Sequence, residues 1–237
     1  MVSRKWLLLI LCLFFAAAGS YAQEYDGYAP ETLIIDVPTA NVLDKYQASF
    51  LTRTYADGSI MESLDFGVIP QINIGFSLAV YEFIGSSDDI KVLNPDFQVK
   101  WKLFDGSLYL PAIAIGYDGR RYGYDRHSKE YMDDRKGGYI TMTREIFTPG
   151  LNASAGINLS DFDRHDIYFF LGASWRLTEW FSLAGEWDNI NNMRDSRLNL
   201  GAHVYITPSL VLSGAARRIG RGDENERILQ LRYVTNF

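Results

Sequence analysis

Cysteine and histidine, two side chains often used as nucleophile and general base, are few in this sequence. The 237 residues include one cysteine, Cys12, and three histidines, His127, His165 and His203. Two of the histidines lie in polar stretches, and His203 lies on the polar side of an alternating segment, with no obvious partnering serine near it in the sequence. A lipid-modifying enzyme would need a serine held beside a base on its lipid-facing wall. We therefore expect no catalytic residue, no enzymatic activity and no cofactor.

Acidic residues in the polar stretches are the second group with possible chemistry, because carboxylate oxygens can bind Ca²⁺. They are Asp118, Asp125, Asp133, Asp134, Asp161, Asp163, Asp223 and Glu224. None of the stretches has the regular ligand spacing of a calcium loop. The pattern is typical of solvated charge, and we expect no metal site.

The third group consists of charged residues that alternate with apolar ones. The basic members are Arg53, Lys100, Lys102, Arg176 and Arg232, and the acidic ones are Asp65, Glu145 and Glu186. On the inner wall of a barrel, a basic path would attract acidic oligosaccharides. Alternatively, the same residues could form ion pairs that close the lumen, since buried charges need partners. Because the two signs nearly balance, the sequence favours the ion pairs.

Only β-strands would place these charged residues on one face, and the apolar residues show the required period of two. In residues 71–83, Ile72, Ile74, Phe76, Leu78 and Val80 alternate with small or polar residues. This pattern predicts a strand with one apolar and one polar face. We expect twelve such strands, at about residues 46–55, 59–69, 71–83, 95–104, 108–118, 138–146, 150–160, 166–177, 181–189, 196–206, 210–219 and 227–237.

The connections between these segments alternate between tight turns and mostly longer polar loops. This alternation is typical of an all-β, antiparallel, up-and-down transmembrane barrel, and an even strand number places both chain ends on the short-turn side. The expected strands average about ten residues, the length that a tilted membrane strand needs. The apolar face would then contact lipid. The candidates for aromatic girdles are Trp101, Trp175, Trp180, Trp187, Tyr109, Tyr117 and Tyr233.

The two ends of the chain carry further signals. Residues 1–22 combine Arg4 and Lys5 with an apolar run and small residues near Ala22, which predicts a cleaved signal peptide. Residues 23–45 are expected to form an N-terminal periplasmic or plug segment before the barrel of residues 46–237, although the long loop 118–136 could also supply a plug. The last strand ends in Phe237, with Tyr233 on the same face, which resembles the assembly signal of outer-membrane barrels.

Composition excludes other classes of protein. Hydrophobic residues make up 47% of the chain, which is too much for a disordered protein. The formal net charge of −6 and a pI near 5.1 argue against nucleic acid as a partner, because nucleic acid requires clustered basic residues.

Six stretches from Leu33 onward, in order along the chain, match a known family: residues 35–40, 64–75, 93–95, 110–117, 138–139 and 184–188. Through them the chain resembles the YjbH-like family of exopolysaccharide-associated outer-membrane β-barrels. The resemblance implies a channel or an accessory barrel that helps surface polysaccharide to leave the cell, and it supplies no catalytic motif.

The sequence therefore predicts a monomeric barrel of about twelve strands in the outer membrane of a Gram-negative-type envelope. Its expected partners are outer-membrane lipid, the barrel assembly machinery, and polysaccharide or periplasmic export proteins. The leading functional hypothesis is a small channel or accessory barrel in polysaccharide export. The alternative is a non-conducting structural or adhesive barrel whose external loops bind partners.

Overall fold

The computed structural model describes residues 27–56, 58–84, 91–107, 109–121, 135–160, 166–192, 195–220, 222 and 225–237. The predicted signal peptide, His127 and His165 lie outside these ranges, as do the acidic candidates for a cation site except Asp118.

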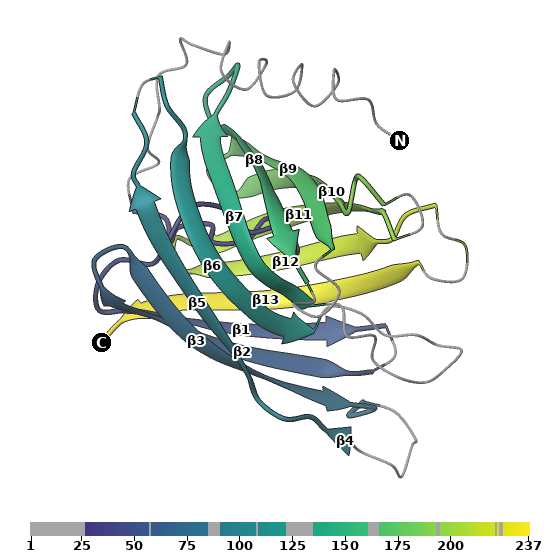
Figure 1. Ribbon diagram of the computed structural model, residues 1–237. Helices are drawn as coiled ribbons and strands as arrows, with labels where there is room; N and C mark the ends of the chain where they lie inside the picture. Colours follow the sequence, from purple (N-terminus) through teal and green to yellow (C-terminus); the bar gives the residue numbers. More distant parts are fainter. Residues whose placement is uncertain are drawn as a thin grey trace.

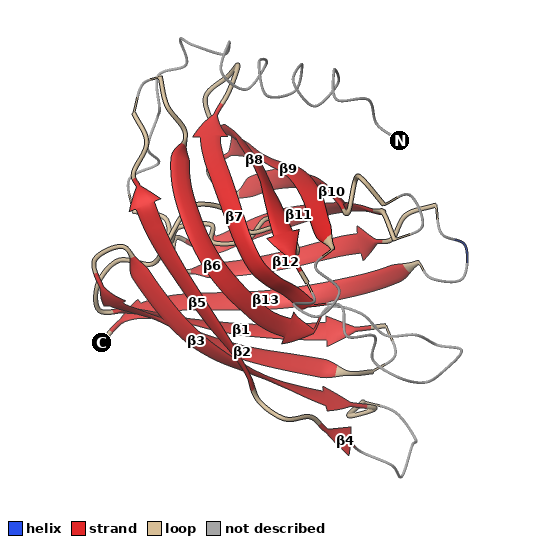
Figure 2. Cartoon of the chain, in the orientation of Figure 1, coloured by secondary structure: helices blue, strands red, loops and turns tan. Residues whose placement is uncertain are grey.

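The described strands form one antiparallel sheet that closes into a barrel (Figures 1 and 2). They are β1 (Gln47–Tyr55), β2 (Ile60–Ile69), β3 (Ile72–Tyr81), β4 (Lys91–Val92), β5 (Asp96–Phe104), β6 (Ala112–Arg121), β7 (Arg135–Glu145), β8 (Leu151–Leu159), β9 (Ile167–Thr178), β10 (Phe181–Asp188), β11 (Arg197–Thr207), β12 (Leu210–Arg217) and β13 (Glu226–Asn236). The first and last strands pair from Gln47 opposite Asn236 to Tyr55 opposite Ile228, which closes the wall. Twelve strands form the barrel and β4 adds a short pairing to β3, so the predicted all-β, up-and-down barrel is confirmed.

Two strands begin three or more residues away from the sequence-based expectation. Strand β6 begins at Ala112 and not near residue 108, because Pro111 cannot donate a backbone hydrogen bond and Ser107 forms a turn through bonds with Leu110. Strand β7 begins at Arg135, three residues earlier than expected, inside a stretch that was assigned to a polar loop. The first residues of β7, Arg135 and Lys136, are charged, so the sequence pattern does not distinguish them from the polar loop that precedes them.

The two faces of the wall have opposite character. Outward side chains are apolar and exposed, for example Phe76 at 56% and Phe97 at 55% of their full accessible area. The neighbouring inward side chains, Ser77 and Gln98, are polar and buried. A water-soluble sheet protein would reverse this arrangement. In the described ranges, no helix is long and apolar enough to cross a membrane.

Aromatic side chains lie near both ends of the barrel. Outward-facing Trp101 and Trp175 lie near the short-turn end, where Trp180 occupies a turn. Tyr117 and Trp187 lie near the end that carries the long loops. This distribution matches the aromatic girdles that flank the apolar belt of membrane barrels.

Candidate functional site: the barrel lumen

Residues 28–44, called the lumen segment below, run through the inside of the barrel. The backbone N–H of Ala29 donates to Pro208 in the short turn between β11 and β12, and Tyr46, just after the segment, donates to Gly67 at the same end. Between these points the chain turns back through a bridge between Leu33 and Pro38. The segment, purple in Figure 1, therefore enters and leaves at the short-turn end.

The tip of the lumen segment, residues 34–37, binds the carboxylate of Glu186, which points inward from β10. The backbone N–H groups of Ile35, Asp36 and Val37 donate to this carboxylate at 2.8–3.1 Å. Asn199 of β11 donates to its Oε1 atom at 2.6 Å. Such hydrogen bonds to a charged acceptor are the stronger kind, so Glu186 fixes the tip against the wall.

The side chain of Asp36 points away from Glu186 and is held by two arginines of the wall. Arg53 Nη1 lies 2.7 Å from Asp36 Oδ1, and Arg217 Nε lies 2.7 Å from Asp36 Oδ2. Arg53 also donates to the carbonyl of Ile35, and Arg217 also pairs with Glu226 at 2.6 Å. Both arginine side chains are fully buried. The wall therefore anchors the tip in two ways. The Glu186 carboxylate binds its backbone N–H groups, and the Arg53 and Arg217 guanidinium groups bind its Asp36 carboxylate.

Burial alone would raise the pKa of Asp36, but the guanidinium groups of Arg217 and Arg53 outweigh it and lower the pKa to about 2. The carboxyl thus loses a proton more readily in the folded barrel than in the unfolded chain. Its contribution to anchoring is complete above the ordinary value of 3.8 and is lost only as the pH falls through about 2.

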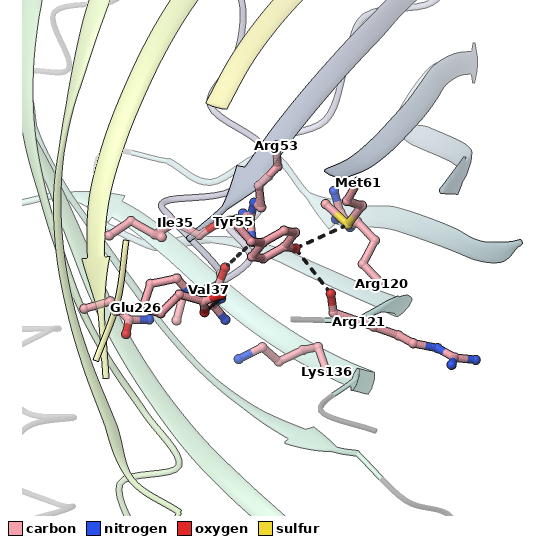
Figure 3. A network of polar contacts seen from close by, with 12 residues as sticks. Ile35, Val37, Arg53, Tyr55, Met61, Arg120, Arg121, Lys136 and Glu226 are labelled. Atoms are coloured by element: carbon pink, nitrogen blue, oxygen red, sulfur yellow. Dashed lines mark hydrogen bonds and ion pairs between the residues drawn. The ribbon is translucent and has the colours of Figure 1, made fainter. Parts of the chain in front are cut away.

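Apolar side chains of the tip complete the anchor. Ile34, Ile35 and Val37 are almost fully buried and belong to a hydrophobic cluster with inward-facing wall residues such as Tyr55 and Met61. Figure 3 shows Tyr55 beside the tip, with its hydroxyl directed toward the Met61 sulfur at 3.8 Å and the Arg121 carbonyl at 3.4 Å. The interior at this level is consequently packed with side chains.

Before and after the tip along the chain, backbone carbonyls of the lumen segment accept hydrogen bonds from basic side chains of the wall. Lys100 Nζ donates to Thr32, Thr39 and Asn41 at 2.7, 3.0 and 3.2 Å. Arg232 Nη1 donates to Pro30 at 2.8 Å. Thr141 of β7, which only β6 separates from β5, donates to the Pro38 carbonyl, and Thr143 accepts the N–H of Ala40. The segment is thus bonded to strands around the whole barrel.

His203 does have a serine partner, contrary to the expectation from the sequence. His203 Nδ1 lies 2.7 Å from Oγ of Ser213, which is opposite it on β12, and Nε2 lies 3.5 Å from Oε1 of Glu31. The cavity at this serine, histidine and glutamate is only about 40 Å³, enough for one water molecule. Because Glu31 also bonds Ser174, the arrangement links the lumen segment to three strands.

The other expected lumen residues lie near the short-turn end. The Arg176 guanidinium carbon is 4.4 Å and 3.9 Å from the ring centroids of Tyr28 and Tyr205. Lys102 pairs with Asp105 at 3.0 Å, and Glu145 accepts the N–H of Gly150. Arg176 and Glu145 line a cavity of about 530 Å³ beside the start of the lumen segment, where the barrel opens at its short-turn end.

Three buried basic residues that form ion pairs in the described part of the lumen were not among the sequence candidates. Arg217 follows the inward alternation of β12 and could have been found from that pattern. Arg120 and Lys136 pair with Asp118 and Asp188 at 2.8 and 2.6 Å, but they fall in a stretch that reads as a loop. Within the described ranges, no three His, Cys, Asp or Glu side chains gather as a metal site would require.

A closed barrel of twelve antiparallel strands with an apolar outer belt and a polar interior defines the outer-membrane β-barrel class. Among solved structures, a KdgM porin matches with a TM-score of 0.53 at 7% identity, covering 79% of this chain and 98% of the porin. A KdgM porin in complex with disordered oligogalacturonate matches with a TM-score of 0.54 at 6% identity, with the same coverage. At this identity the likeness concerns the fold alone. No family model matches the sequence, and no curated protein matches it.

Proposed function

We propose that this chain is an integral outer-membrane barrel that acts as a normally closed channel, with the lumen segment as its plug. The observation that carries this proposal is the anchoring of the tip, in which Asp36 binds Arg53 and Arg217 while the backbone N–H groups bind Glu186. A solute can pass only after the plug leaves this position. Export to the outer membrane would follow cleavage of the signal peptide after Ala22.

The topology supports a plug that can be withdrawn. The lumen segment belongs to no strand of the wall, and it enters and leaves at the same end of the barrel. Its removal would therefore break side-chain contacts and leave the pairing of the twelve strands intact. An element with two such positions is what a gate requires.

We propose surface polysaccharide as the cargo. The resemblance to the YjbH-like family supports this role, and one KdgM porin with the same fold was solved with oligogalacturonate. Lys100 and Arg232, which now bind backbone carbonyls of the plug, would face the lumen once the plug had left. Candidate partners are polysaccharide and the periplasmic proteins that deliver it.

The alternative is a barrel that never conducts and binds partners through its external loops. The buried ion pairs of Asp36 with Arg53 and Arg217 favour this alternative. Moving the lumen segment out would break them, and breaking a buried ion pair costs about 3–5 kcal/mol. Recordings of the refolded chain in planar bilayers distinguish the two functions. A normally closed channel gives a silent baseline with rare openings, a structural barrel gives no openings at all, and a steady current would contradict the plug.

The outer face provides a test of membrane insertion. Leu231 lies at the middle of β13 and is 43% exposed. Replacing it with Arg should destabilise the barrel in lipid vesicles by about 2–4 kcal/mol, because a charge at mid-membrane is costly. Urea unfolding monitored by heat-modifiable gel migration measures the change, with Leu231→Ala as the uncharged control. Equal stability of the two variants would argue against a lipid-facing position.

The terminal residue provides a test of assembly. Phe237 packs edge-on against Tyr46 and Phe66 at 6.2 and 5.8 Å, and its N–H donates to Tyr46 where β13 meets β1. We expect Phe237→Ala to lower the amount of folded barrel in outer membranes several-fold, because both barrel closure and the proposed terminal signal with Tyr233 are weakened. The control is Phe104→Ala, at the short-turn end of β5. Normal levels of the Phe237 variant would contradict the assembly role.

A further inference from the structure

Arg53 and Arg217 of the wall together bind one carboxylate of the plug, that of Asp36. The two oxygens of Asp36 are held separately, one by Arg53 Nη1 and the other by Arg217 Nε, each at 2.7 Å. Each contact is a charge-assisted hydrogen bond from a guanidinium group, the kind of bond with which arginine recognises carboxylates. The carboxylate itself comes from a segment that is not part of the wall.

Strands of the wall carry both arginines, so the positions of their backbones do not depend on the lumen segment. Arg53 lies on β1 and Arg217 on β12, the two neighbours of β13 in the barrel. Arg53 is opposite Gln230 in the strand pairing, and Arg217 is opposite Glu226, with which it is also ion-paired. The sheet therefore holds both residues at this place on the wall, and the ion pair with Glu226 fixes the Arg217 side chain independently of the plug.

The charge of the plug is complementary to that of the wall. Residues 28–44 include Glu31, Asp36 and Asp44 but no lysine or arginine. Basic wall residues contact the segment at several levels, through Lys100 and Arg232 as well as the arginine pair. In the closed state, an acidic segment thus lies against basic side chains of the lumen wall.

We propose that Arg53 and Arg217 form a carboxylate-binding site of the open lumen, that its ligand is a polysaccharide bearing uronate carboxylates, and that Asp36 occupies this site in the closed state. The inference rests on the proposed function, since a ligand reaches the site only after the plug has left. Ligand and plug then exclude each other. An acidic polysaccharide that binds only the open barrel must also shift the equilibrium toward opening.

Bilayer recordings of the chain from Gln23 to Phe237 test this site. The probes are an alginate trisaccharide, which carries three carboxylates, and neutral maltotriose. In an Asp36→Asn variant, whose plug is weakened but whose arginines are intact, the alginate trisaccharide should halve the current at a concentration at least about tenfold lower than maltotriose does, as expected for charge-assisted hydrogen bonds.

The same measurement in two further variants assigns the effect to the site. Adding Arg53→Gln should abolish most of the preference for the acidic trisaccharide. Adding Arg227→Gln, which removes the same charge from an exposed residue of β13, should preserve it. If Asp36→Asn does not give a heat-modifiable barrel, Glu186→Gln replaces it, because that change also weakens the plug and leaves both arginines in place.

The outcomes separate this inference from the proposed function. Equal block by both sugars in an open variant would overturn the carboxylate site and leave the plug standing. A folded variant that stays closed would overturn the proposal that these contacts hold a removable plug, and with it the carboxylate site, because no ligand could then reach the arginines. A preference that survives Arg53→Gln would show that other charges attract the sugar, and would also overturn the assignment.

Discussion

Replacing Asp36 by asparagine is expected to convert a nearly silent barrel into one that opens often. The substitution keeps the size of the side chain but leaves Arg53 and Arg217 without the carboxylate that now contacts both at 2.7 Å. Breaking a buried ion pair in this way costs about 3–5 kcal/mol. The ratio of closed to open barrels should therefore fall between about a hundredfold and a few thousandfold.

Single-channel open probability measures this change directly. The matched control is Asp44→Asn, the same substitution in the same segment at an exposed position. We expect the control to behave like the unmodified chain. In the unmodified chain, the low pKa of Asp36 predicts that its ion pairs with Arg53 and Arg217 persist from neutral pH down to about pH 4. An Asp36→Asn barrel that is folded and as silent as the control would show that the ion pairs do not hold the plug.

The second large effect is expected from Glu186→Gln. The carboxylate accepts hydrogen bonds from three consecutive backbone N–H groups and from Asn199. A glutamine has only one accepting oxygen, and its amide nitrogen would meet donors. Loss of at least one charge-assisted bond costs about 1.5–3 kcal/mol, so open probability should rise by about ten- to a hundredfold.

Glu179→Gln is the control for this substitution, because Glu179 is an exposed residue of the short turn between β9 and β10. The two lumen substitutions act on the same tip, so their effects should not add when combined. Additive effects would mean that Asp36 and Glu186 hold independent parts of the chain, which the tip geometry does not allow.

The wall of this barrel could be predicted from its sequence because strand structure leaves a local signal. The period of two in residues 71–83 identified β3 and the correct outward face, and the alternation of short and long connections gave the order of the strands. Errors arose where tertiary contacts override local polarity. The local sequence predicts that Lys136 lies in a loop, but Lys136 belongs to β7, where its buried side chain forms an ion pair with Asp188.

The interior could be predicted less well, because its contacts join residues far apart in the chain. Asp36 and Arg217 are separated by 181 positions, and nothing near either residue indicates the other. The same holds for the Ser213 partner of His203, which only the register of β11 and β12 reveals. The sequence could therefore name a plug as one possible role of residues 23–45 but not the contacts that hold it.

The most direct test of the account is the chemical accessibility of the plug tip. The chain from Gln23 onward contains no cysteine, so Val37→Cys introduces a single thiol at a position that is 0% exposed. In the folded barrel we predict that this thiol reacts with a water-soluble maleimide at least about a hundredfold more slowly than Thr178→Cys at an exposed position, since reaction requires the plug to open. Equal rates in a heat-modifiable barrel would mean that the segment does not occupy the lumen, and would contradict a barrel closed by residues 28–44.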